Sequence, residues 1–346
     1  MTVKHHMKDL YQRLKPLGFD EKFVRAVLLP DWWDDELAGI PANRTLAEAS
    51  IAKHLKIGFA QICDPLATLS LPLTTSFRLK SATRGTNPEV IRPSIVIAQR
   101  MAALLARSVK NEVLDTGRFT AAEVRVQVLV HAPSVTLEGL LRFCWERGIV
   151  VAHLDQLPKG TGFRKFDGLA LFAGDRPCIL LAEKHDAPAW LAFHLAHELG
   201  HLMLGHVTPD SELLPDDNLE RVVNDQVEDA ADAFASELLI GDPNPNLRTI
   251  YGMTAAKLAA AVQNFGTRKQ IDPAAFALVY GHNADRMPVA ISALKLMNQF
   301  TGARDQIRRA LLEHISLDEL FDSEAHFVEQ LALRSAEAAQ QSVEEP

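Results

Sequence analysis

Apolar and polar positions along the chain predict strands in its middle part and helices on either side. Residues 123–130 alternate apolar and polar side chains with the period of a half-buried strand, so we predict a strand there. Residues 168–173 and 178–182 are short apolar runs separated by the turn sequence Gly-Asp-Arg-Pro. Such a connection is typical of a hairpin or another tight link between two strands.

Helical periodicity governs most of the remaining sequence. Residues 136–147 predict a helix that begins after Thr136 as its N-cap and ends before Gly148. Helices are then expected from Pro188 onward, until the Gly-Asp-Pro-Asn-Pro-Asn segment at 241–246 interrupts them. Further amphipathic helical stretches follow at 254–265, 287–300 and 304–314.

These patterns divide the chain into four parts. Residues 1–115 are predicted to be mostly helical and end at an Asp-Thr-Gly turn signal. Residues 116–245 contain the predicted strands, and residues 246–334 are again helical. The tail at 335–346 is rich in Ala, Gln and Glu, and we expect it to be disordered.

Composition places the chain among ordinary globular proteins. Hydrophobic residues make up 47% of its 346 residues and charged residues 23%, which excludes the disordered and fibrous classes. No run of apolar residues is long enough for a membrane span, and the N-terminus lacks a secretory signal. Three widely spaced cysteines form neither a disulfide framework nor a Cys-based zinc site. We therefore expect a cytoplasmic protein without a membrane partner.

Charge is distributed unevenly. The net charge of −8 is the sum of +4 for residues 1–115 and −12 for the remainder. The densest basic stretch begins at Arg78 and ends at Lys110, and Glu89 is its only acid. Such a stretch favours either a nucleic-acid contact or, as we prefer, a solvated face of a helical region.

The segment around His197 contains the candidate metal-binding and catalytic residues. His197-Glu198-Leu-Gly-His201 lies within a helix-compatible apolar pattern. Positions i and i+4 lie on one face of a helix, so the two imidazoles can bind one ion. Zinc lowers the pKa of a bound water to about 7, and the carboxylate of Glu198 is placed to take the proton from that water. Burying two histidines and a glutamate among leucines is costly unless a metal satisfies them.

A second predicted helix supplies the third ligand. Glu228 follows His201 in a helical pattern whose apolar face packs inward, and a carboxylate from a second helix completes His₂Glu zinc sites. Asp232 lies one turn further on the same face, where an acid can orient a ligand histidine. The alternative site with three histidines fails, because Leu204 and Val207 stand where Gly and His are required. We therefore expect His206 to be a surface residue at the helix end.

These residues together resemble the ImmA/IrrE family of zinc metallopeptidases. The resemblance depends on the segment from His197 to Leu204 and on Glu228-x-x-Ala-Asp-x-Phe-Ala-x-Glu-Leu-Leu, and it covers about residues 120–245. The family usually has a second Glu two residues after the first, where this chain has Ala230. That departure makes Glu228 the only candidate for the third ligand.

The resemblance implies a fold and a role. The fold class is α+β, a zincin-like metallopeptidase domain at 116–245 with a small antiparallel sheet, flanked by mostly helical regions. The implied activity is zinc-dependent cleavage of a partner helix-turn-helix transcriptional repressor, in stress response, mobile-element transfer or phage defence. The resemblance implies that His197, His201 and Glu228 bind Zn²⁺ and that Glu198 is the catalytic residue. Asp232 would orient one of the ligand histidines.

An alternative function comes from the N-terminal region. Residues 45–63 have the rhythm of a helix-turn-helix, with Gly58 at the turn. Residues 59–64, where a reading helix is expected, contain one amide and no cation, so packing or partner docking is at least as good an interpretation. The alternative is a DNA-binding regulator whose zincin domain serves as a metal or ligand sensor.

Overall fold

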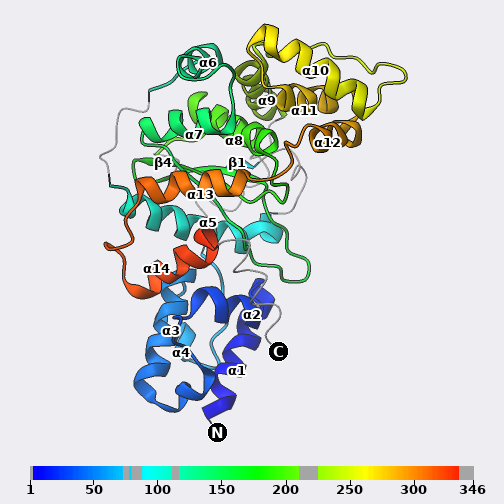
Figure 1. Cartoon of the computed structure of the whole chain (residues 1–346). Coiled ribbons are helices and arrows are strands. Elements are labelled where there is room, and N and C mark those ends of the chain that lie inside the picture. Colours follow the sequence, from blue (N-terminus) through cyan, green and yellow to red (C-terminus); the bar gives the residue numbers. More distant parts are fainter. Residues whose placement is uncertain (1–2, 73–77, 80–87, 111–116, 210–224, 335–346) are drawn as a thin grey trace.

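The chain forms a small sheet enclosed by helices (Figure 1). The computed structural model describes residues 3–72, 78–79, 88–110, 117–209 and 225–334. The strands are β1 (Arg78–Leu79), β2 (Val150–His153), β3 (Gly168–Ala173) and β4 (Arg176–Leu181). The helices are α1 (Val3–Leu14), α2 (Glu21–Phe23), α3 (Pro41–Leu55), α4 (Phe59–Cys63), α5 (Pro88–Ser108), α6 (Ala121–Leu129), α7 (Leu137–Glu146), α8 (Pro188–Met203), α9 (Asp225–Ile240), α10 (Ala255–Lys269), α11 (Pro273–Asn283), α12 (Met287–Leu296), α13 (Ala303–His314) and α14 (Asp322–Val328). Short 3₁₀ or π turns are η1 (Lys15–Leu17), η2 (Val24–Leu28), η3 (Asp35–Gly39) and η6 (Glu329–Leu333).

The sheet has the strand order β1-β3-β4-β2. β3 and β4 form the predicted hairpin, and β1 pairs antiparallel with the other edge of β3. The α+β class is confirmed, but the sheet is mixed, because β2 runs parallel to β4. All four residues of β2 are buried, and an apolar run without alternation does not reveal the direction in which a strand pairs.

The strand predicted at 123–130 is wrong, because this segment belongs to α6. Thr120 and Glu123 form a capping box in which each side chain accepts a hydrogen bond from the backbone N–H of the other residue. Val124 and Val128, one turn apart, are buried, whereas the valines two residues after each of them are exposed. The cap therefore outweighs the strand preference of alternating valines.

The other predicted elements that fall on described residues agree with the structure. Thr136 caps α7 by accepting a hydrogen bond from the Gly139 N–H, and Thr254 caps α10 in the same way. α8, α12 and α13 occupy the stretches predicted as helical, and no helix or strand crosses 241–246. α11 was not predicted, although Asp272 caps it and Pro273 begins it. The predicted tail at 335–346 and most of the turn before residue 117 lie outside the described residues.

Helices α1–α4 gather at one end of the molecule and α10–α12 at the other, with the sheet, α7 and α8 between them (Figure 1). One hydrophobic core nevertheless extends from Met7 to Ala332 and includes the sheet, α8 and α9. A second, smaller cluster lies among α10, α11, α12 and the start of α8. The four-part division of the chain stays a prediction. Among the described helices, none has the length and apolar character needed to cross a membrane.

Several arginines of the basic stretch form ion pairs with acidic residues of the same chain. Arg100 and Arg107, both on α5, pair with the fully buried carboxylate of Glu324 on α14, and Lys53 on α3 pairs with it too. Arg92 pairs with a neighbouring acid on α5. Helix α4, at the position of a reading helix, is only five residues long.

Candidate metal centre

Helix α8 carries the His-Glu-x-x-His motif into the interior. Pro188 at its start is suited to a first helical turn, and the helix packs against β3, β4, α7 and α9. Because it is covered on nearly every side, its polar residues are removed from water together with its leucines. The side chains of His197, Glu198 and His201 are all 0% exposed.

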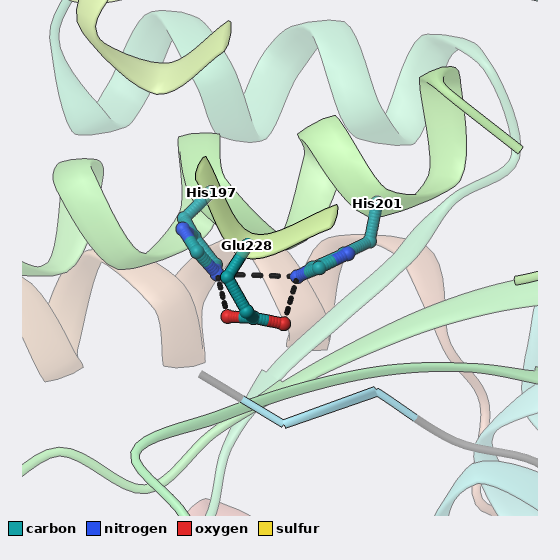
Figure 2. A group of neighbouring side chains, drawn as sticks. All are labelled: His197, His201 and Glu228. Atoms are coloured by element: carbon teal, nitrogen blue, oxygen red, sulfur yellow. Dashed lines mark hydrogen bonds and ion pairs between the residues drawn. The ribbon is translucent and has the colours of Figure 1, made fainter. Parts of the chain in front are cut away.

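Helix α9 places Glu228 opposite the two histidines (Figure 2). Its carboxylate is 2% exposed, with Oε2 3.4 Å from His197 Nε2 and Oε1 3.5 Å from His201 Nε2. The two Nε2 atoms are 3.1 Å apart. All three side chains thus direct their ligand atoms at one point between the helices.

Each histidine has a partner on the side away from this point. His197 Nδ1 lies 2.8 Å from Oδ1 of Asp232, one turn along α9 from Glu228. His201 Nδ1 lies 3.0 Å from Nδ1 of His206. A hydrogen bond at Nδ1 fixes the orientation of the ring and leaves Nε2 directed at the common point.

His206 reaches this position through the way in which α8 ends. Gly205 takes the left-handed conformation at φ +72°, and its N–H donates to the Leu202 carbonyl while the N–H of His206 donates to the His201 carbonyl. These two bonds form a Schellman motif, which folds the chain back over the last helical turn. His206 thus lies at the helix end, as predicted, but it is partly buried and contacts His201, which the prediction did not include.

The charges around His197 favour a cation. Burial lowers the pKa of His197, but hydrogen bonds to Asp232 and Glu228 and the charge of Glu198 together raise it to about 9. The same carboxylates that hold a proton on the ring would attract a divalent ion in its place.

Glu198 lies beside the start of β3. A Cβ atom added to Gly168 would lie 2.5 Å from Oε1 of Glu198, so only glycine leaves room for this carboxylate. The contact joins the motif helix to the sheet at one residue. It was not predictable from either segment alone, because the two residues are brought together only by the packing of α8 on β3.

The three converging side chains fit a tetrahedral metal ion. Ligand atoms about 2.0–2.1 Å from a tetrahedral zinc lie roughly 3.3 Å from one another. The two imidazole nitrogens are 3.1 Å apart, and each lies 3.4 or 3.5 Å from a different oxygen of the Glu228 carboxylate. Oε2 of Glu228 is buried, and His197 Nε2 at 3.4 Å is its only close partner among the described residues. An ion would satisfy this buried oxygen.

Fold and site together define an α+β domain with a helix-borne His-Glu-x-x-His motif and a buried group suited to a metal. Residues 144–262 match the Peptidase_M78 family model, described as the IrrE N-terminal-like domain, so this part of the chain is similar to peptidases of that family, and its His/His/Glu group could hold a metal ion. Searches of curated proteins and of solved structures gave no match.

The structure brings the predicted residues to one place. His197, His201 and Glu228 converge, and Asp232 stands behind His197. Their roles as ligands and as an orienting residue stay predictions, as does the catalytic role of Glu198. Sequence reasoning did not identify Gly168, and it placed His206 at the surface, although the Gly205-His206 pair after the helix is the signal of a Schellman motif.

Proposed function

We propose that the chain is a zinc-dependent metalloendopeptidase whose active site lies between α8 and α9. The observation that supports this most directly is the buried convergence of His197, His201 and Glu228. Two neutral imidazoles and one carboxylate are the protein ligands of a catalytic zinc site that leaves a fourth position open. Asp232 and His206 would hold the two rings in place.

The residues have separate tasks in peptide-bond hydrolysis. A bound zinc would supply the acidity that activates water near neutral pH and would polarise the peptide carbonyl. Glu198 is the general base, which takes a proton from the attacking water as its oxygen bonds to the carbonyl carbon. The same carboxyl group then gives that proton to the leaving amine as the C–N bond breaks, so Glu198 ends the cycle ionised. Glu198 is wholly buried, which strengthens its electrostatic effect on the reacting atoms.

The substrate we propose is a partner helix-turn-helix repressor. This proposal comes from the resemblance to the ImmA/IrrE family, whose members typically cleave such repressors and are often encoded beside them. Cleavage would release genes for stress response, mobile-element transfer or phage defence. The same reasoning makes the cytoplasm the place of action.

Metal content tests the site first. Purified wild type is expected to contain about one zinc per chain by elemental analysis, because the cluster supplies three ligands. Glu228→Ala should lose most of it. Glu237→Ala, on the same helix but outside the cluster, is the matched control and should keep it. A wild type without metal would contradict the proposal.

The catalytic role of Glu198 is tested separately from metal binding. Glu198→Gln is expected to keep zinc and to lose cleavage at least 100-fold, because an amide cannot take the proton from water. Cleavage is measured by gel and mass spectrometry, with unfolded casein and with a helix-turn-helix repressor encoded beside the gene for this chain. Cleavage retained by the zinc-loaded variant would contradict the mechanism.

The alternative function, a DNA-binding regulator, stays a prediction. Arg92, Arg100 and Arg107 of the basic stretch pair with acids of the same chain. No observation on the described residues therefore favours this alternative.

A further inference from the structure

The carboxyl group of Glu198 occupies the space of the side chain that Gly168 lacks. A Cβ atom on Gly168 would lie 2.5 Å from Oε1, 2.9 Å from Cγ and 3.0 Å from Cδ of Glu198. Apart from the chain neighbours of the glycine, these are the three atoms nearest to that position. Atoms that are not bonded to each other pack at about 3.5–4.0 Å, so a side chain at residue 168 and the present position of the carboxyl group exclude each other.

The backbone of Gly168 does not itself require glycine. The residue begins β3 opposite Leu181 of β4 in a regular antiparallel register, and it is not among the glycines with positive φ. Glycine weakens a strand, because it loses more conformational entropy on folding and has no side chain to pack. Its presence in a strand often marks the close approach of another group, and at this position that group is the carboxyl end of Glu198.

Glu198 has little room to move away from β3. Its side chain is 0% exposed, and α8 packs against both β3 and α9. Gly200 lies about 200° further around α8, on the side away from Glu198. A Cβ atom on Gly200 would lie only 3.2 Å from Cβ of Phe234 on α9. Helix α8 is therefore held closely between the sheet and α9, and a side chain at residue 168 would displace the carboxyl group rather than the helix.

The position of Glu198 decides how well it can act as a general base. A base must lie within about 2.6–3.2 Å of the group whose proton it takes. Relief of the contact from 2.5 Å to an ordinary distance of about 3.5 Å requires a shift of about 1 Å. A misplacement of about 1 Å can lower the rate of an enzyme about 100-fold. The space at Gly168 therefore matters for the reaction and not only for the packing of the sheet.

We propose that Gly168 is a positioning residue, which sets the place of the Glu198 carboxylate relative to the metal site. The chemical consequence rests on the proposed peptidase function, whereas the contact itself does not. The ligands of the metal would then be placed by α8 and α9, and the general base by α8 and the first residue of β3. One missing side chain in the sheet would thus determine the distance between base and ion.

A double-mutant cycle on the metal-free full chain tests the contact without zinc or activity. Gly168→Ala is made in the wild type and in a Glu198→Ala background, and urea unfolding is measured for all four proteins. We expect Gly168→Ala to raise the equilibrium constant of unfolding at least tenfold in the wild type. In the Glu198→Ala background, where the space is empty, the change should stay within twofold. A Gly168→Ala variant that folds only in the Glu198→Ala background would support the proposal, and equal effects in both backgrounds would overturn it.

The consequence for the base is measured on the zinc-loaded full chain. Acetohydroxamic acid loses its N–OH proton when that oxygen binds zinc, and Glu198 is placed to take this proton as it would from water. We expect Gly168→Ala to keep about one zinc per chain, to weaken acetohydroxamate binding at least threefold, and to lower kcat on unfolded casein at least tenfold with KM within twofold. In the Glu198→Ala background it should not weaken acetohydroxamate binding further, because the base is already absent.

The remaining outcomes separate this inference from the proposed function. Unchanged kcat and acetohydroxamate binding in zinc-loaded Gly168→Ala would overturn the positioning role, while the peptidase site would stand. A wild type that holds no zinc and cleaves neither casein nor the repressor would overturn the proposed function. The unfolding cycle would then still decide whether Gly168 and Glu198 determine each other's place.

Discussion

The hydrogen bond between His197 and Asp232 decides how firmly one ligand is held. Asp232 accepts the Nδ1 proton at 2.8 Å and so leaves Nε2 free to bind an ion. Replacing Asp232 by Ala is expected to weaken zinc binding 10- to 100-fold, because the ring loses both its orientation and its basicity. Competition with a zinc chelator measures the affinity. Asp229→Ala, an exposed change on the same helix, should have no such effect, and equal affinities in the two variants would contradict the prediction.

At the scale of residues, the sequence predicted the site residues that lie one helical turn apart on the same helix. His197 and His201 are one turn apart on α8, and Glu228 and Asp232 are one turn apart on α9. Gly168 could not be predicted, because its role depends on where an unconnected helix packs. The contact of His206 was accessible in principle, since the geometry of a helix end is local.

At the scale of elements, Glu324 joins α14 to α3 and α5. Burial alone would raise the pKa of Glu324, but hydrogen bonds from Lys53, Arg100 and the Phe321 N–H outweigh it and lower the pKa to about 2. A folded-state pKa below the ordinary value of 4.5 stabilises the fold above about pH 4.5, and this stability is lost as the pH falls through about 2. The shift corresponds to about 3 kcal/mol at pH 7.

Glu324→Gln is therefore expected to lower the free energy of unfolding by about 3 kcal/mol at pH 7. The difference from wild type should shrink to about 1.4 kcal/mol at pH 3, where the unfolded carboxyl is already protonated. Urea unfolding at the two pH values measures both quantities. Glu319→Gln, an exposed neighbour, serves as the control, and equal loss in both variants would be evidence against a special role for this carboxylate.

The elements that sequence reasoning missed share a physical cause. α6 has the alternating valines of a strand, and only its capping box reveals the helix. β2 was not predicted, because its four residues are all buried and so lack the apolar-polar alternation of a half-buried strand. α11 is apolar on most sides, so it lacks the amphipathic period, yet Asp272 and Pro273 are an ordinary helix start. In α6 and α11 a local helix-start signal competed with the periodic pattern.

At the scale of the whole molecule, the core is larger than the matched peptidase domain. α5 packs on β3, α7 on α8 and α13 on β2, and only part of this set lies within residues 144–262. We expect a fragment of residues 144–262 to lack a cooperative thermal transition and to bind zinc poorly, because it loses the helices that cover the sheet. Circular dichroism and elemental analysis measure this, with residues 1–334 as the control. A fragment that melts cooperatively with one zinc bound would show that the domain is autonomous.

The two helices that supply the ligands give the proposed ion a second effect. His197 and His201 belong to α8 and Glu228 to α9, so an ion among them would clamp the two helices together. Ligand binding to the folded state alone adds free energy that grows with the logarithm of the free ligand concentration. Above the dissociation constant, each tenfold rise in free zinc would add about 1.4 kcal/mol to the resistance of the chain to unfolding. The lifetime of the protein in a cell would then follow the zinc supply, and a cell short of zinc would degrade the protein faster than a cell with ample zinc.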